Sequence, residues 1–288
     1  MINFQHMIKF PISLLCVVAG FISAGAHQNV AVKYNASNRD TDSGNILTKE
    51  MILVANPTRS LYYNKMSLYV DSCMSTPEGA AKLREVQDKA MRVEHPDGTV
   101  TWDGWKYGRV APKKEVDLYV MKDVDHNLMT VYDRKAGESR SYDESLSEIS
   151  WEIVGDSTKT ILGYDCIMAE SDYHGRKWKA WFTMDIPVQD GPWKLHGLPG
   201  IILEADGGDD FSIVATEVGG TFQDVPTVYS LSGYQKGDRK KILSEHEHYI
   251  NNLESILAAQ GIKINGDGSP ANLPKYDRRR QAWETDYK

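Results

Sequence analysis

The segment Gly191–Glu204, "GPWKLHGLPGIILE", combines chain-breaking residues with apolar side chains. Five of its first ten residues are glycine or proline, yet the segment as a whole is strongly apolar. Leu198–Ile201 predicts a type II turn, because Pro199 presets φ at the second position and Gly200 accepts the positive φ of the third. A strand-like run, Ile201–Ala205, follows directly. The apolar side chains of such a loop can be buried only if the loop folds back onto a β-sheet.

The rest of the chain supplies strands for that sheet. Between Val116 and Gly219, eight short runs rich in β-branched and aromatic residues alternate with polar turns, which is typical of antiparallel strands. Upstream, two further strand-like runs cover Ile46–Ala55 and Ser60–Val70, and Ser75–Arg92 predicts a surface helix. The polar residues His27–Asn45 show no periodicity and predict a loose lead-in.

One amphipathic helix is predicted near the C-terminus, with Asp238 as its N-cap and Gly261 as its C′ residue. Its apolar face carries Ile242, Leu243, His246, Ile250, Leu253, Ile256 and Leu257. Residues 262–288 are rich in turn-forming and charged residues and predict a poorly ordered tail. We therefore expect an α+β fold that is mostly β. It is a curved antiparallel sheet, half of a barrel, packed on the C-terminal helix, by analogy with periplasmic lipoprotein carriers.

The N-terminal segment 1–26 differs in composition from the rest of the chain. Lys9 precedes an apolar stretch, Phe10–Ala26, which ends in the A-x-A pattern of a secretory signal peptide. The alternative, a transmembrane anchor, needs about 20 apolar residues, and this stretch is shorter. We expect cleavage after Ala26 and a single domain over residues 27–261. The mature protein would be periplasmic or secreted and would have no transmembrane segment.

Charge and cysteine content restrict the possible functions. The net charge of -7 argues against nucleic-acid binding, which normally needs a basic face. Cys73 and Cys166 remain after removal of the leader. In an oxidising compartment they could form a disulfide, and they could equally be two buried free thiols. There is no C-x-x-C pair and no metal-ligand spacing, so neither a metal nor a cofactor is predicted.

Six consecutive residues, Gly197–Ile202, read GLPGII. They resemble the signature of the GLPGLI family of secreted bacterial proteins, with Ile201 in place of the usual leucine. The resemblance extends over Trp151–Ala205, and Cys166 occupies the cysteine of the family's Lys-x-Ile-x-Gly-Tyr-x-Cys positions. It implies an exported, β-rich protein of Gram-negative bacteria with a relation to outer-membrane β-barrel receptors. The family offers no agreed catalytic residues.

The chain-breaking part of the opening segment, Gly191–Gly200, is called the signature loop and contains the candidate site residues. They are Trp193, Lys194, His196, Leu198, Pro199 and Gly200. His196 could contact a ligand or a metal, but a packed histidine is the simpler interpretation, because a site needs several converging groups. Lys194 could hold an anion, and a lysine lying along the surface is favoured over that role. No nucleophile elbow, phosphate loop or dinucleotide fingerprint occurs, so no catalytic residue is predicted.

Three functions remain open at this point. The preferred hypothesis is an exported, non-catalytic binding or carrier protein of the cell envelope that holds an apolar ligand in a groove. The second is an interaction partner of an outer-membrane β-barrel receptor, which predicts an exposed apolar patch. The third is a hydrolase whose site assembles in space around His196.

Overall fold

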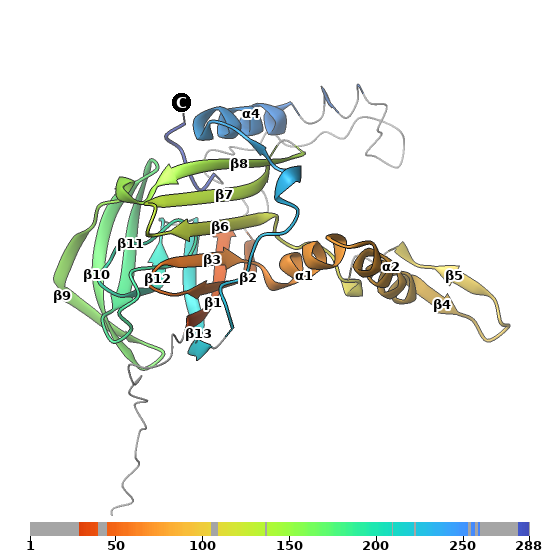
Figure 1. The fold of residues 1–288 in the computed structure, drawn as a ribbon, viewed down its shortest axis with the longest axis horizontal. Coiled ribbons are helices and arrows are strands. Elements are labelled where there is room, and N and C mark those ends of the chain that lie inside the picture. Colours follow the sequence, from red (N-terminus) through yellow and green to blue (C-terminus); the bar gives the residue numbers. More distant parts are fainter. Residues whose placement is uncertain are drawn as a thin grey trace, which may run out of the picture.

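The computed structural model describes residues 29–39, 45–104, 109–135, 137–208, 210–221, 223–252, 255–256, 259 and 282–287. Its main feature is one open, curved sheet of twelve strands (Figure 1). These are β1 (Asn29–Arg39), β2 (Ile46–Ala55), β3 (Arg59–Tyr63), β6 (Leu118–Asp123), β7 (Leu128–Lys135), β8 (Glu138–Ser145), β9 (Glu152–Ile161), β10 (Tyr164–Tyr173), β11 (Arg176–Thr183), β12 (Ile201–Asp206), β13 (Phe211–Thr221) and β14 (Gln235–Lys236). Their order across the sheet is β14-β8-β7-β6-β3-β2-β1-β13-β12-β11-β10-β9. All neighbours pair antiparallel except the short β14 with β8, so the predicted fold class is confirmed.

The segment expected to be a loose lead-in forms a central strand instead. β1 pairs with β2 on one side and with β13 on the other. The reason is an alternation with period two: Val30, Val32 and Tyr34 are buried on one face, while Ala31 and Lys33 between them are partly exposed. Burial of these side chains in the sheet decides the structure, and the many polar residues of the segment concealed the pattern in the sequence.

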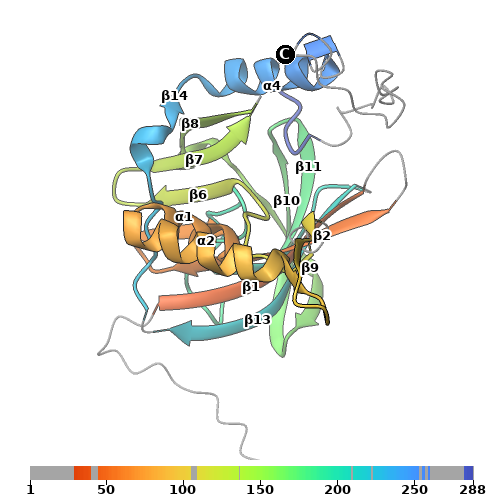
Figure 2. The same ribbon diagram turned by 90° about the vertical axis from the view of Figure 1, so that its right-hand side faces the viewer.

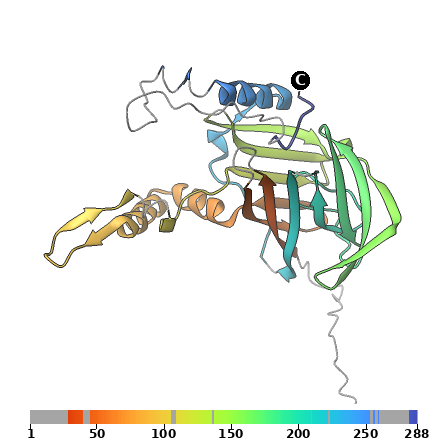
Figure 3. The ribbon, with the colours of Figure 1, turned by 180° about the vertical axis from the view of Figure 1, so that it is seen from behind.

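An arm projects from the sheet after β3 (Figure 1, Figure 3). It consists of α1 (Lys65–Met74), α2 (Pro77–Met91), β4 (Arg92–Glu94) and β5 (Val100–Trp102). The expectation of a strand over Ser60–Val70 is therefore wrong for its second half. Asn64 ends the strand because its side chain accepts a hydrogen bond from the backbone N–H of Ser67 at 2.9 Å and caps α1. The helix predicted for Ser75–Arg92 corresponds to α2.

The last helix, α4 (Arg239–Asn251), lies along the β8 end of the sheet and contacts β7 and β8 (Figure 2). Asp238 is its N-cap, as predicted, and accepts from the backbone N–H of Lys241 at 2.8 Å. Ile242 and Leu243 of the predicted apolar face are buried. The predicted C′ residue Gly261 and the signal peptide lie outside the described residues. No helix in the described part of the chain is long and apolar enough to cross a membrane.

The signature loop fills the concave side of the sheet. It connects β11 to β12, and its side chains Trp193, Leu195 and Leu198 are at most 3% exposed. They join one apolar cluster with residues from strands at both ends of the sheet, such as Tyr142 on β8 and Ala169 on β10. A chain-breaking loop can be apolar here because it forms the centre of the core.

A buried lysine satisfies the backbone of this loop. The Lys122 side chain on β6 is 2% exposed, and its Nζ lies 2.5 Å from Asp190 Oδ1. The same Nζ donates to the carbonyls of Gly191 at 2.9 Å and Leu195 at 3.3 Å. Buried loops are rare because their backbone polar groups lose water, so such a loop needs donors of this kind. Burial lowers the pKa of Lys122, and the Asp190 carboxylate opposes that shift.

The predicted type II turn is wrong in its geometry. Gly197, with φ of 86°, has the left-handed conformation, and Gly200 does not. The backbone N–H of Gly200 instead donates to the carbonyl of Leu198 at 2.7 Å. Glycine is required at position 200 for a different reason: a Cβ there would overlap the carbonyl oxygen of Thr183, far inside the 3.0 Å that real Cβ atoms keep. Glycine at this position therefore permits the close packing of two backbone segments.

Replacing Gly200 with alanine should destabilise the protein by about 1–3 kcal/mol or more, because the Thr183 backbone must move. Gly219→Ala on β13 is the matched control, since Gly219 has a negative φ and no neighbour within 4 Å of a built Cβ. That change should be neutral or slightly stabilising. Thermal unfolding of both variants measures the difference, and equal melting temperatures would contradict the close-packing account.

Candidate functional site

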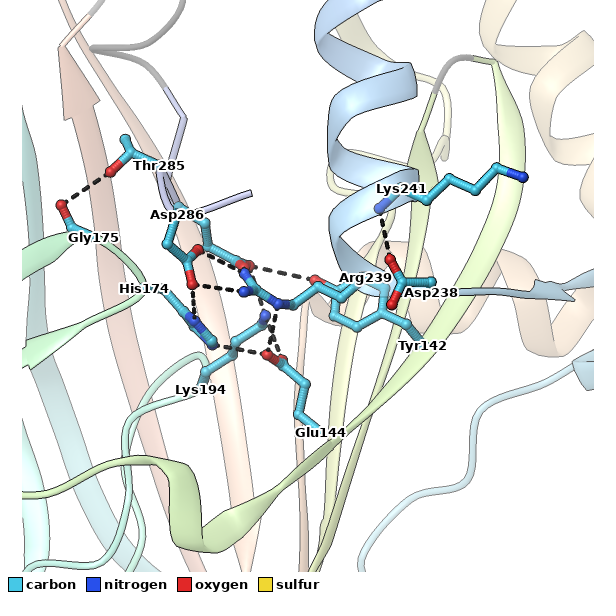
Figure 4. A network of polar contacts seen from close by, with 11 residues as sticks. Tyr142, Glu144, His174, Gly175, Lys194, Asp238, Arg239, Lys241, Thr285 and Asp286 are labelled. Carbon is cyan, nitrogen blue, oxygen red and sulfur yellow. Dashed lines mark hydrogen bonds and ion pairs between the residues drawn. The ribbon is translucent and has the colours of Figure 1, made fainter. Parts of the chain in front are cut away.

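Curvature of the sheet brings β8 close to the turn between β10 and β11 at one open end of its concave side. This end of the sheet is called the mouth. Glu144 lies on β8, near one edge, and His174 lies in the turn between β10 and β11, near the other. Their side chains meet there, with His174 Nε2 at 2.8 Å from Glu144 Oε1 (Figure 4). Six charged or titratable residues gather at this point and are called the charged cluster. They are Glu144, His174, Lys194, Arg239, Glu284 and Asp286.

Lys194 of the signature loop is the innermost cation of the cluster. Its side chain is fully buried, and Nζ lies 2.5 Å from Glu144 Oε2 and 2.6 Å from Glu284 Oε1. The ammonium also lies 4.7 Å from the centre of the Tyr142 ring, within cation–π range. The expectation of a surface lysine is therefore wrong. Two carboxylates that are remote in sequence compensate its charge, which permits its burial.

Arg239, the first residue of α4, is the second cation. Its NH1 and NH2 atoms donate to Asp286 Oδ1 at 2.9 Å and Oδ2 at 2.6 Å, a two-pronged carboxylate contact. It also contacts Glu284, and its Nε lies 3.2 Å from Glu144 Oε1. Burial opposes the charge of Arg239, but these carboxylates raise its pKa.

Two carboxylates of the cluster, Glu144 and Asp286, are stabilised in their ionised form. Burial by itself would raise the pKa of Glu144, but His174 and Lys194 outweigh it and lower that pKa to about 2. Arg239 likewise lowers the pKa of Asp286 against the effect of burial. Within the described part of the chain, two sets of three residues have the spacing of metal ligands, and both contain His174. Lys194 and Arg239 occupy carboxylates of these sets, and their charges would repel a metal cation.

Beside the charged cluster, aromatic rings surround Trp283. The Trp178, Trp193 and Phe211 rings lie 6.2, 5.4 and 4.9 Å from it, centre to centre, and Trp178 is stacked on it at 15°. These three side chains are buried and are called the aromatic box. Stacked and tilted ring pairs at these separations are favourable beyond their buried area. The box therefore holds a flat ring, and Lys194 of the charged cluster lies 5.6 Å from the centre of the Trp193 ring.

Trp283, Glu284 and Asp286 belong to the C-terminal segment, residues 282–287, which packs across the mouth. The backbone N–H of Thr285 donates to the carbonyl of His174 at 2.9 Å. Its hydroxyl donates to the carbonyl of Gly175 at 2.9 Å (Figure 4). The expectation of a poorly ordered tail over 262–288 does not hold for these residues. Their binding partners, such as His174 and Arg239, are distant in sequence, so the local pattern gave no sign of the contacts. Residues 262–281 lie outside the described part of the chain.

A cavity of about 270 Å³ adjoins the segment. Apolar side chains such as Leu243, Ile250 and Trp193 line it together with the polar Asp133 and Lys135. Such a size and mixed lining suit a small ligand or a side chain of a larger one, at the low end of known ligand sites. The lining of this cavity is mixed, whereas the groove expected from the sequence was apolar.

The remaining predicted residues of the loop do not reach the mouth. His196 is buried, and in the described part of the chain its two ring nitrogens contact the carbonyls of Lys194 and Leu146, both at 2.7 Å. Burial lowers its pKa, and among the described residues no hydrogen bond joins its ring to a Ser, Cys, Asp or Glu side chain. Leu198 and Gly200 are buried in the core, and Pro199 is exposed. Only Trp193 and Lys194 of the predicted set contribute to the site.

The two cysteines are free thiols, so the disulfide left open by the sequence is absent from the structure. Cys73 lies on α1 in the arm, and Cys166 lies on β10 near the far edge of the sheet. Burial raises the pKa of Cys166 to about 11, as expected for an inert core thiol.

The architecture defines an open, curved antiparallel sheet whose mouth combines buried cations with aromatic rings. The chain matches the model of a family described as "Protein of unknown function (Porph_ging)" over residues 172–204. This segment includes His174, the aromatic Trp178 and Trp193, Lys194 and the Gly197–Ile202 signature, so the family-level resemblance is confirmed.

Other comparisons add little to this assignment. Among curated proteins no match was found. Two solved structures of PNGF-II, in space groups C2 and P21, are each 14% identical to this chain with a TM-score of 0.48. Each alignment covers 77% of this chain but only 33% and 34% of the PNGF-II chains. The chain therefore spans about a third of the length of these structures.

Proposed function

We propose that this protein is an exported binding protein of the cell envelope whose site is the mouth of the sheet. The export step rests on the predicted signal peptide, residues 1–26, and places the protein in the periplasm or outside the cell. The ligand is an anion that carries an aromatic ring, and it therefore differs from the apolar ligand expected from the sequence. The observation that supports this most is the position of two cations that both contact carboxylates of the C-terminal segment: Lys194, fully buried and 5.6 Å from the centre of the Trp193 ring, and Arg239, partly buried.

Physical chemistry favours a carboxylate ligand over a neutral one. The planar guanidinium of Arg239 has a fork of donors that fits a carboxylate, and Lys194 adds a point charge. Glu144 alone cannot neutralise both cations, so a vacant mouth would leave positive charge in a partly buried place. Binding of an anion removes that cost, and the aromatic box contributes ring stacking.

The test uses the full chain with the substitutions Glu284→Gln and Asp286→Asn, which weaken the internal carboxylates. The probe is N-acetyl-tryptophanyl-glutamate, titrated by calorimetry. We expect at least ten-fold tighter binding than in the parent protein. Adding Arg239→Lys, which keeps the charge but loses the fork, should weaken binding about ten-fold. Lys240→Ala, an exposed cation on the same helix, is the control and should leave binding unchanged. No binding in any of these folded variants would refute the proposal.

A second candidate function is the attachment of a partner protein through the arm. Several large apolar side chains of the arm are exposed, among them Tyr69, Met74, Val86 and Trp102, the last at 60%. Apolar side chains gathered on a projecting unit are typical of interaction surfaces. An outer-membrane β-barrel receptor, as the family resemblance implies, would be such a partner. A photo-crosslinker at position 102 should then capture one membrane protein in intact cells, and no crosslink there would count against it.

A further inference from the structure

The C-terminal segment occupies the mouth in the manner of a bound peptide. Its Trp283 ring lies in the aromatic box, Glu284 contacts Lys194 and Arg239, and Asp286 contacts Arg239. Within the segment, the backbone of Thr285 donates to a carbonyl in the turn between β10 and β11. The contacts are therefore one ring, two carboxylates and a backbone hydrogen bond, as in the recognition of a short motif.

The surface under the segment is built from other parts of the chain. Glu144 stays within ion-pair distance of both Lys194 and Arg239, so the two cations share one counter-ion if the segment leaves, and the remaining positive charge favours another acidic chain in its place. Trp178 and Trp193 contact each other at 5.3 Å and do not need Trp283 to define the box. The segment forms no strand of the sheet. It is the part of this site that can be exchanged for another chain of similar chemistry.

Gly175 leaves space for this segment because it has no side chain. It lies in the turn between β10 and β11 with φ of 77°, and a Cβ there would overlap Thr285. Gly163, in the turn between β9 and β10, has a similar φ of 85° and no neighbour within 4 Å of a built Cβ. Conformation alone would require glycine at both turns, but only Gly175 also gives the segment room to approach.

We propose that the mouth recognises an extended peptide of a partner protein with an aromatic residue followed by acidic residues, of the pattern Trp-Glu-x-Asp, and that residues 282–287 are an internal competitor for it. This rests on the proposed function and names its ligand class. The competitor keeps the site closed until a partner peptide is abundant. Its covalent attachment gives it an effective concentration on the order of millimolar, which a free peptide must exceed.

The experiment uses the whole folded chain and cuts only the covalent connection between residues 282–287 and the rest of the protein. A site for a specific protease is inserted within residues 262–281, so that cleavage leaves the last residues held by contacts alone. The probe is a fluorescent synthetic peptide with the sequence Gln281–Lys288, followed by anisotropy, and native mass spectrometry reports the bound species. We expect the cleaved protein to exchange its own segment for the probe. Its apparent affinity should be at least ten-fold higher than that of the uncut protein.

Two controls separate recognition from simple attachment. A peptide of the same composition in scrambled order should not displace the probe. In the cleaved protein, Gly175→Ala should weaken probe binding at least ten-fold, whereas Gly163→Ala, which has the same backbone strain, should not.

Two outcomes would overturn the inference. One is a cleaved protein that retains its segment for a day against excess probe while it remains folded. The other is a cleaved protein that loses its segment only as it unfolds, because the segment would then be a permanent part of the core. If the dipeptide probe of the preceding section binds but this peptide does not, the proposed function stands and the peptide ligand class is wrong.

Discussion

Lys122→Ala is expected to lower the free energy of unfolding by about 3–5 kcal/mol, because it leaves the Asp190 carboxylate buried without its partner. Both side chains are nearly inaccessible, at 2% and 9% exposure. The carbonyls of Gly191 and Leu195 lose a donor in the same step. For a domain of this size, such a loss corresponds to a fall in melting temperature of roughly 6–20 °C.

Lys33→Ala is the matched control for this prediction. Lys33 also lies 2.5 Å from a carboxylate, that of Glu217, but both groups are exposed to solvent. Exposed ion pairs contribute little because water already solvates the separate charges. Thermal unfolding should therefore separate the two lysine variants clearly. If Lys122→Ala melts like Lys33→Ala, the buried lysine does not anchor the signature loop.

Trp193→Ala should destabilise the protein by about 3–5 kcal/mol, the usual cost of removing a fully buried aromatic side chain. The ring contacts Trp178, Trp283 and Tyr173, at 5.3, 5.4 and 6.4 Å between centres. Its removal therefore damages the core and the aromatic box together. Chemical denaturation gives the change in the free energy of unfolding, provided that its dependence on denaturant concentration has the same slope in the parent and the variant.

The backbone at position 193 allows a sharper comparison. Trp193 has φ of 53°, a left-handed conformation that costs a non-glycine residue about 1–2 kcal/mol. Trp193→Gly loses the same ring but relieves this strain, so it should be at least as stable as Trp193→Ala. Trp102→Ala, at an exposed tryptophan of the arm, should change stability by less than about 0.5 kcal/mol. An alanine variant more stable than the glycine variant would contradict the strained conformation.

Much of the fold follows from local pattern. Six of the eight short runs between Val116 and Gly219 correspond to β6, β7, β8, β10, β11 and β13, whereas the two runs over residues 150–154 and 159–163 form the single strand β9, without the turn expected between them. Asp238 caps α4 as expected. Two local errors have local causes. The many polar residues around Val30, Val32 and Tyr34 concealed β1, and a single capping side chain, Asn64, turned a strand-like run into a helix.

The site could be predicted only in part. Trp193 and Lys194 were identified because they lie in a conspicuous motif, although Lys194 was expected at the surface. Glu144, His174 and Asp286 had no signal of their own in the sequence. An isolated acidic residue in a strand or a tail is usually solvated, and nothing near it in the chain shows that a cation will meet it.

The sequence by itself determined the strands, the capped helix and the burial of an apolar, chain-breaking loop. These depend on side-chain periodicity and turn chemistry within windows of about ten residues. Only the tertiary structure decided which residues form the charged cluster and where residues 282–287 pack. His174 and Asp286 are 112 positions apart, and Tyr142 and Glu284 are 142 apart. Such pairs form because the curved sheet brings its two ends together, and that curvature is a property of the twelve paired strands as a whole.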